Sequence, residues 1–135
     1  MRRSCLRASG RRMIRGLGID IVEVDRIRRA IARWGEAFLC RVFTPDELAG
    51  GGAPQGAAER LAGRFAAKEA VMKALGLGRQ GVGWQEIEIT VDPFGKPGVR
   101  LTGRAATVAE RLGVRAWHVA ISHTRLLAVA EALAE

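Results

Sequence analysis

The sequence is poor in aromatic residues: it contains no tyrosine, and phenylalanine and tryptophan together make up 5% of its 135 residues. Nucleic-acid-binding proteins commonly combine a basic surface with aromatic side chains on which bases stack. The net charge here is +8, but five of the positive charges are arginines within the first twelve residues. Residues 13–135 therefore carry only +3, which suits an acidic protein partner or a polyanionic small molecule at least as well.

Cysteine and long apolar runs are also scarce. Cys5 and Cys40 lie too far apart in the sequence to indicate a metal knuckle or a redox pair, and we expect both thiols to be reduced, as is usual in the cytosol. No stretch approaches the roughly 20 apolar residues that cross a bilayer, and the first residues lack the apolar core of a secretory signal. The sequence therefore predicts a cytoplasmic protein without a membrane partner.

The first twelve residues (MRRSCLRASGRR) are rich in arginine and contain no acidic residue. Such a composition buries too little apolar surface to fold by itself. We expect residues 1–12 to form a disordered arm that is dispensable for stability and turnover. Residues 13–135 are expected to form one folded domain, since a chain of this size buries about two thirds of its unfolded surface.

The first half of this domain contains one strand pattern and two helix starts. Residues 14–22 are β-branched and glycine-spaced, which predicts a strand, and residues 23–34 have apolar side chains at helical spacing. After a turn, Thr44, Pro45 and Glu47 stand in the order of a capping box, which predicts a short helix. The glycine-rich stretch that follows predicts a loop.

The longest predicted helix spans residues 57–75 and is ended by Gly76. Its buried stripe is expected to consist of Leu61, Phe65, Met72 and Leu75. The remaining predicted elements are strands over 87–91, 99–101, 117–121 and 126–132 and a helix over 103–112. This order predicts an α+β fold in which an antiparallel sheet packs against the long central helix.

Three acidic and basic side chains are the first candidates for chemistry. Asp20 lies between two isoleucines in the first strand, where an unpaired buried carboxylate would cost several kcal/mol; alternatively, it is a strand-end acid bonded to amides of the next helix. Glu69 and Lys73 are four residues apart on the long helix, which is also the spacing of a surface ion pair worth about 0.3–0.5 kcal/mol. Small side chains surround this pair and would allow close approach by another element or a ligand: Ala62, Ala66, Ala70 and Ala74.

Ser122, His123 and Thr124 end an apolar alternating strand. A histidine at such a place is a candidate for catalysis or binding, although it is also a common structural residue. With only two histidines in the chain, a histidine-rich zinc site is not indicated. The sequence has no Walker loop, no GxSxG elbow and no GxGxxG turn, so NTP hydrolysis, α/β-hydrolase chemistry and dinucleotide binding have no support.

Four motifs together resemble one family. GIDIVEVDRI at residues 18–27, RFAAKEAVMKALG at residues 64–76, WQEIEITVDPFGKPGVRLTG at residues 84–103 and ISHT at residues 121–124 have the order and separations of the motifs in 4′-phosphopantetheinyl transferases of the carrier-protein-synthase type. The resemblance extends from Ile14 to about Glu131. Only the arginine-rich arm and the glycine-rich loop fall outside it.

The resemblance implies the fold of that family and a magnesium-dependent transfer reaction. In this reaction a serine of an apo acyl carrier protein attacks the β-phosphate of coenzyme A, takes up 4′-phosphopantetheine and releases adenosine 3′,5′-bisphosphate, in support of fatty acid biosynthesis. Asp20 and Glu69 match the carboxylates that hold Mg²⁺, and Lys73 matches a lysine that faces the phosphates. Asp20, Glu69 and a metal-bound water all stay open as the general base.

The resemblance also implies binding residues and an assembly. Contacts to the nucleotide and its phosphates are expected from Arg64, Lys73, Gly95, Lys96, Pro97, His123 and Thr124. Arg26 and Arg33 lie seven residues apart, hence on one helix face, and match a basic face that binds the acidic helix of a carrier protein; a merely solvated face is the alternative. Family members form homotrimers with active sites between subunits, and we expect the same here.

Two other kinds of function would fit parts of the sequence. A small basic nucleic-acid-binding protein would need a basic stripe in the folded part, which a charge of +3 does not indicate. A binding module that holds coenzyme A or a carrier protein without catalysis would lack Asp20, Glu69 or Lys73, and all three are present. We therefore expect an enzyme with no nucleic-acid partner.

Overall fold

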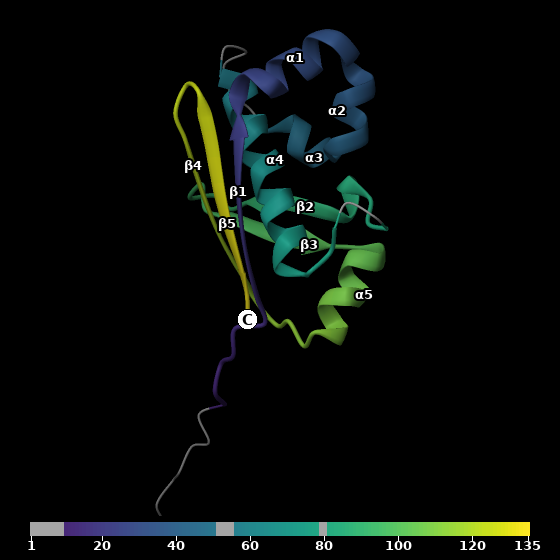
Figure 1. The fold of residues 1–135 in the computed structure, drawn as a ribbon, viewed down its shortest axis with the longest axis vertical. Helices are drawn as coiled ribbons and strands as arrows, with labels where there is room; N and C mark the ends of the chain where they lie inside the picture. The colour runs from purple at the N-terminus through teal and green to yellow at the C-terminus, as the bar shows by residue number, and fades with distance from the viewer. Residues whose placement is uncertain (1–9, 51–55, 79–80) are drawn as a thin grey trace, which may run out of the picture.

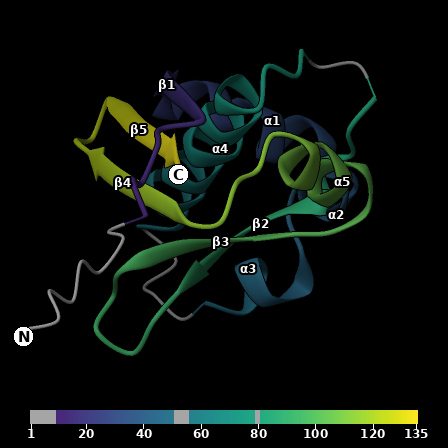
Figure 2. The same cartoon turned by 90° about the horizontal axis from the view of Figure 1, so that it is seen from below.

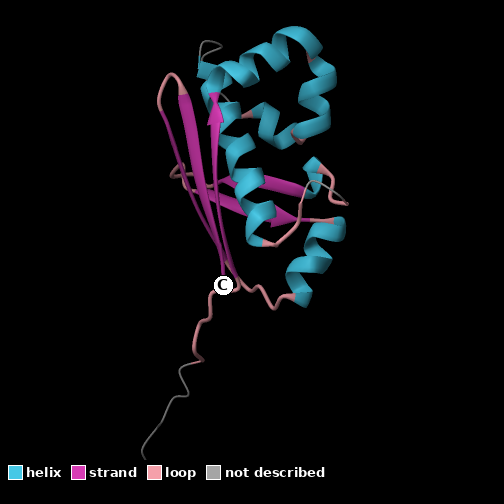
Figure 3. Cartoon of the chain, viewed as in Figure 1, coloured by secondary structure: helices cyan, strands magenta, loops and turns pink. Residues whose placement is uncertain are grey.

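A computed structural model describes residues 10–50, 56–78 and 81–135 (Figures 1 and 3). The strands are β1 (Gly16–Glu23), β2 (Ile87–Val91), β3 (Pro97–Leu101), β4 (Trp117–His123) and β5 (Leu127–Ala134). The helices are α1 (Val24–Trp34), α2 (Glu36–Val42), α3 (Pro45–Ala49), α4 (Ala57–Ala74) and α5 (Gly103–Arg111), and η2 (Trp84–Glu86) is a short 3₁₀ helix. The predicted α+β class is confirmed.

The strands form two antiparallel sheets. In the three-stranded sheet β5 lies between β1 and β4, so that the first and last strands of the domain pair. Strands β2 and β3 form a separate hairpin. Seen from below, the three-stranded sheet and the β2–β3 hairpin lie on different sides of α4 (Figure 2). The strands expected to form one antiparallel sheet are therefore divided between two, the three-stranded sheet and the β2–β3 hairpin.

Helix α4 is the centre of the core, because it packs against β1, β5, β4, β2 and α1. The predicted stripe is confirmed, since its members are all buried: Leu61, Phe65, Met72 and Leu75. Burial is not confined to one side, however. Residues 61–72 are buried without exception, because other elements surround this helix, and that run includes the charged side chains Arg64, Lys68 and Glu69.

Two glycines bring β1 unusually close to α4. A Cβ atom at Gly16 would overlap the carbonyl oxygen of Ala74, and one at Gly18 would overlap that of Ala70. Since any side chain at these positions would push the strand away, glycine is required for this close approach. The contact fixes where along α4 the following residues of β1 lie.

The alternation of β1 places its large apolar side chains on the outer face of the sheet. Successive side chains of a strand point to opposite faces. Gly16 and Gly18 face α4, so the alternate residues face outward: Leu17, Ile19 and Ile21. Ile19 and Ile21 are 56% and 62% exposed. The isoleucines next to Asp20 are thus at the surface, and Asp20 itself lies on the inner face, beside Ala130 of β5.

The segment between α1 and α3 differs from the prediction. A turn was expected there, but α2 fills it after Gly35, whose φ of 55° separates the two helices. The short helix α3 has the predicted capping box: Thr44 Oγ1 accepts from the Glu47 amide at 3.3 Å, and Glu47 Oε1 accepts from the Thr44 amide at 2.9 Å. The sequence was sufficient to predict α3, because the two residues of its capping box, Thr44 and Glu47, lie within one helical turn.

Parts of the predicted organisation lie outside the described residues. These are residues 1–9 of the arm, including Cys5, and residues 51–55 of the glycine-rich loop. Cys40 is exposed and forms no disulfide. Within the described ranges, no helix has the length and apolar character needed to span a membrane.

Candidate active site

An ion pair between β1 and α4 brings two of the predicted catalytic residues together. Lys73 Nζ donates to Asp20 Oδ1 at 3.1 Å and to the carbonyl oxygen of Ile19 at 2.8 Å. The glycines before Asp20 allow this contact, because they hold β1 against the turn of α4 that precedes Lys73. The partner of Asp20 is therefore the lysine ammonium of the central helix, and not the next helix along the chain.

Glu69 lies one helical turn before Lys73 and so faces the same side of α4. Its exposure is only 9%, which rules out the alternative of a solvated surface pair. Asp20 of the strand is thus paired with Lys73, and Glu69 lies one helical turn before that lysine. This arrangement can hold a cation and can neutralise phosphate charge.

The donor set fits magnesium better than a transition metal. The described residues contain no group of three or more His, Cys, Asp or Glu side chains placed to hold a metal ion. Zinc sites normally use three or four such ligands, whereas magnesium is usually bound by one or two carboxylates together with water and substrate phosphates. Asp20 and Glu69 are the candidates for such a set.

A completely buried ion pair lies directly beside Glu69 and was not predicted. Lys68 Nζ is 2.6 Å from Glu47 Oε1, and neither side chain is exposed. The ammonium also donates to the carbonyl oxygens of Trp84 at 3.0 Å and Ile87 at 2.6 Å. Burial lowers the pKa of Lys68, and the attraction of Glu47 offsets only part of this effect.

The Glu47 carboxylate also accepts hydrogen bonds from backbone amides. Its Oε1 accepts from the Thr44 amide and its Oε2 from the Ile89 amide, at 2.9 and 3.2 Å. The pair therefore joins α3, α4 and β2 around the turn that carries Glu69. Because the two residues are 21 positions apart, no local pattern reveals the pair, although a lysine within an otherwise apolar helix segment is a usable signal.

Arg64 lies on the α3 side of the helix in this structure. Its Nη1 donates to the carbonyl oxygen of Glu47, and its guanidinium lies against Gly50. Burial and the neighbouring Arg60 lower the pKa of Arg64. Among the described residues, its contacts do not include Asp20 or Lys73, so the predicted nucleotide contact is not part of the same cluster.

His123 and Thr124 lie at the turn between β4 and β5, where they line a hollow of about 350 Å³ with Gly56, Glu59 and Arg125. Thr124 Oγ1 accepts from the amides of Leu126 and Leu127, so this hydroxyl shapes the turn. The hollow brings the predicted His123 and Thr124 beside the start of α4.

Two residues of this hollow were missed by sequence reasoning. Glu59 binds the Arg28 guanidinium at 2.8 Å, and Arg125 directly follows the ISHT motif. Arg125 adds a cation that suits a phosphate. Its position directly after the ISHT motif could have identified Arg125 as a candidate from the sequence.

Gly95, Lys96 and Pro97 form the turn of the β2–β3 hairpin. Asp92 Oδ1 accepts from the Phe94 and Lys96 amides, both at 2.8 Å, and Gly95 has a φ of 85°. The turn is therefore well ordered by its own bonds. Over the described ranges, no hydrogen bond or ion pair joins this turn to Asp20 or Lys73.

The two arginines predicted to bind a carrier protein are exposed on α1. The Arg26 guanidinium lies 5.8 Å from the Phe65 ring centre, and that of Arg33 lies 4.8 Å from the Trp34 ring centre. The helix is anchored on its other side by Val24 and Ile27. Both arginines are thus accessible to a partner.

Comparison with known proteins points to one family. The family model described as the 4′-phosphopantetheinyl transferase superfamily matches residues 16–127. The chain is 49% identical over 124 residues to a holo-[acyl-carrier-protein] synthase of Koribacter versatilis, which covers 91% of this chain and 99% of that relative. The matched region contains Asp20, Glu69 and Lys73.

Solved structures agree with the sequence match. The crystal structure of holo-[acyl-carrier-protein] synthase from Neisseria meningitidis has a TM-score of 0.80 and 38% identity, and covers 91% of this chain and 99% of its own. The crystal structure of the Helicobacter pylori synthase in complex with coenzyme A has a TM-score of 0.76 and 29% identity. It covers 88% of this chain and 99% of its own. The fold expected from the sequence motifs is confirmed.

Proposed function

The chain belongs to the 4′-phosphopantetheinyl transferase superfamily, as an enzyme of the holo-[acyl-carrier-protein] synthase type, and we propose that it uses magnesium to transfer 4′-phosphopantetheine from coenzyme A to a serine of apo acyl carrier protein. The observation that supports the proposal is the ion pair of Asp20 with Lys73 between β1 and α4, one helical turn after the buried Glu69. The reaction then takes place in the cytoplasm and supports fatty acid biosynthesis, and it involves neither nucleic acid nor a membrane.

The residues of the chain have distinct tasks in this reaction. The serine oxygen forms a bond to the β-phosphorus of coenzyme A, and the bond to the bridging oxygen breaks with release of adenosine 3′,5′-bisphosphate. The serine proton passes to Glu69 or Asp20. Lys73, oriented by the Ile19 carbonyl oxygen and Asp20, neutralises the charge that develops on the phosphates, since phosphoryl transfer depends mainly on positioning and charge stabilisation.

Asp20 and Glu69 would hold the magnesium ion, which supplies Lewis-acid neutralisation of the phosphate oxygens. The buried pair of Glu47 and Lys68 keeps the α4 turn beneath Glu69 in place. Because Glu69 is itself shielded from water, its carboxylate acts in a medium where electrostatic interactions are stronger than in bulk solvent.

Formation of adenosine 3′,5′-bisphosphate from coenzyme A, followed by chromatography, tests this proposal. Product is expected with an apo acyl carrier protein and absent with a carrier protein whose acceptor serine is replaced by alanine. Consumption of coenzyme A at the same rate with both carrier proteins would show hydrolysis and contradict transfer.

We propose further that three chains assemble and that the nucleotide contacts are shared between neighbours. The turn at 95–97 and the His123–Thr124 turn lie on elements other than those that carry Asp20 and Lys73. The outer face of the three-stranded sheet offers an apolar surface for a second copy, made of exposed and half-buried residues: Leu17, Ile19, Ile21, Val129 and Leu133. These residues surround the exposed Glu131 on the same face, and an apolar patch of this kind is typical of an interface.

Ile19→Glu is expected to convert a trimer into monomers, because it places a charge in the centre of this patch beside Glu131. Light scattering of the unchanged chain should give the mass of three copies, and the variant should give one copy with most transfer activity lost. Leu112→Glu, at an exposed apolar position after α5, should leave the assembly intact. A fully active monomer would contradict the shared site.

Arg26→Glu is expected to raise the KM for the carrier protein far more than the KM for coenzyme A. Exposed charge pairs are worth about 0–1 kcal/mol each, but reversal adds repulsion to the lost attraction. Salt should weaken the carrier-protein step in parallel, because screening acts within about 8 Å at physiological ionic strength. Arg33 lies two turns away on the same face and should respond in the same direction.

Steady-state kinetics with each substrate varied in turn measure this effect, and Arg111→Glu on the exposed side of α5 is the matched charge reversal. Equal increases in both KM values would indicate a distorted site. Unchanged kinetics would rule out docking on α1 without affecting the assignment of the catalytic residues.

A further inference from the structure

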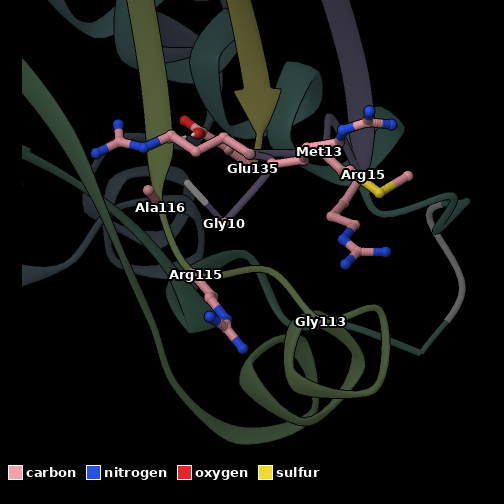
Figure 4. Close-up of a pocket in the computed structure, with 9 residues that line it drawn as sticks. Gly10, Met13, Arg15, Gly113, Arg115, Ala116 and Glu135 are labelled. Atoms are coloured by element: carbon pink, nitrogen blue, oxygen red, sulfur yellow. Dashed lines mark ion pairs between the residues drawn. The ribbon is translucent and has the colours of Figure 1, made fainter. Parts of the chain in front are cut away.

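A hollow of about 490 Å³ lies at the end of the three-stranded sheet where β1 and β4 begin and β5 ends (Figure 4). We call it the arginine pocket. Three segments of the chain form it: residues 10–15, residues 113–116 and Glu135. Its charged lining residues are Arg11, Arg12, Arg15, Arg115 and Glu135. The volume falls in the range of small-molecule sites, about 300–1,000 Å³.

Backbone hydrogen bonds hold these segments together. The Arg15 amide donates to the carbonyl oxygen of Ala134, and the Arg115 amide to that of Glu135, both at 2.6 Å. Ala116 and Glu135 exchange two further backbone bonds at 2.9 Å. The Cα positions of Arg15 and Arg115 are therefore fixed by the sheet, whereas the lining residues 10–12 belong to the arm that precedes β1.

Two of the guanidinium groups converge inside the pocket. Figure 4 shows Arg15 and Arg115 extending from two sides toward Gly113. A Cβ atom at Gly113 would lie 3.6 Å from the Arg15 Cζ, and Gly113 has a φ of 76°. Glycine at the end of α5 thus leaves space for the Arg15 guanidinium.

The pocket is lined by four arginine side chains and one acidic side chain, that of Glu135. Glu135 Oε1 pairs with Arg12 at 3.5 Å, and Glu135 Oε2 lies 2.8 Å from His118 Nε2. Arg11, Arg15 and Arg115 form no ion pair with any described residue, and residues 1–9, 51–55 and 79–80 contain no Asp or Glu. Clustered like charges repel one another, so an external anion would stabilise this arrangement.

We propose that the arginine pocket binds a small polyphosphate anion. Guanidinium groups bind phosphate oxygens through two parallel hydrogen bonds, and several of them around one hollow favour a ligand with consecutive phosphates. The hollow is open to solvent, because its four arginines are all exposed. Its arginines gather at one end of the sheet, whereas a nucleic acid would need an extended basic stripe. The phosphate chain could come from a nucleotide or from an inorganic polyphosphate.

The pocket is separate from the proposed transfer site. Ala116, which lines it, immediately precedes β4, whereas His123 is the last residue of that strand. Asp20, Glu69 and Lys73 do not line the pocket. Its ligand is therefore additional to coenzyme A, and the inference does not depend on the proposed function.

Isothermal titration calorimetry of the full chain with tripolyphosphate at low salt tests the proposal. We expect one tripolyphosphate to bind in the pocket of each chain. The double variant Arg15→Ala/Arg115→Ala should raise the Kd by at least about tenfold, because two charge-assisted contacts are lost. Arg29→Ala/Arg111→Ala removes two exposed arginines elsewhere and should change the Kd less than about twofold. Tighter binding of ATP than of tripolyphosphate would identify a nucleotide as the source of the phosphates, and equal binding an inorganic polyphosphate.

A Lys73→Ala chain distinguishes the two phosphate-binding sites. It should bind tripolyphosphate as the unchanged chain does, and the Arg15/Arg115 double variant should retain phosphopantetheine transfer. No binding by the unchanged chain, or binding that depends on Lys73 and not on Arg15 and Arg115, would overturn the proposal. Tighter binding of a single-stranded DNA oligonucleotide than of tripolyphosphate would overturn the assignment to a small ligand.

Discussion

Asp20→Asn and Glu69→Gln are each expected to lower the turnover number by at least about 10²–10³-fold, the usual loss when one group that stabilises transition-state charge is removed. Each change replaces a carboxylate oxygen by an amide nitrogen, which does not bind a hard cation. The shape of the side chain is retained. Lys73 is half exposed, so loss of its charged partner at Asp20 should leave the fold intact.

Turnover and circular dichroism melting curves of both variants measure this effect. Glu110→Gln, an exposed acid on α5, is the matched control and should keep full activity. Excess EDTA should stop the unchanged enzyme, and added magnesium should restore it. Full activity of either variant, or of the unchanged enzyme in EDTA, would show that these carboxylates do not hold a required metal.

Lys68→Met is expected to lower the free energy of unfolding by about 3–5 kcal/mol, the cost of removing one partner of a buried ion pair. The change leaves the Glu47 carboxylate buried without its counter-ion. It also removes the donor to the carbonyl oxygens of Trp84 and Ile87. Urea denaturation followed by tryptophan fluorescence gives the value.

A second variant separates the buried charge from side-chain packing. Glu47→Gln/Lys68→Met removes both charges, while the amide oxygen can still accept a backbone hydrogen bond, so it should recover part of the loss. Lys96→Met in the exposed hairpin turn is the control and should stay within about 0.5 kcal/mol of the unchanged chain. A loss below about 1 kcal/mol for Lys68→Met would mean that the pair contributes little.

Local sequence signals predicted those elements whose partners are close in the chain. The capping box of α3 and the alternation of β2 and β4 depend on neighbouring residues, and all three elements are present. Helix α2 was missed because the segment between the predicted helix 23–34 and Thr44 was interpreted as a turn, whereas Gly35 only separates two helices. The burial of α4 on all sides depends on β1, β5 and β2 together, which a helical stripe cannot show.

In the candidate site, too, the sequence identified residues within motifs but not contacts between distant segments. The motifs identified Asp20, Glu69 and Lys73, and the structure brings Asp20 to Lys73 through the close packing of β1 on α4. The sequence did not reveal the Glu47–Lys68 pair, because the two residues meet only when α3 folds over α4. The arginine pocket was missed for a similar reason, since its three segments come from both ends of the domain.

The central claim is that this chain transfers phosphopantetheine, and the intact mass of an apo acyl carrier protein after incubation with the enzyme, coenzyme A and magnesium tests it most directly. We predict a mass gain of one phosphopantetheine per carrier protein, which disappears in the Asp20→Asn enzyme. An unchanged carrier-protein mass with the folded, unmodified enzyme would contradict the account.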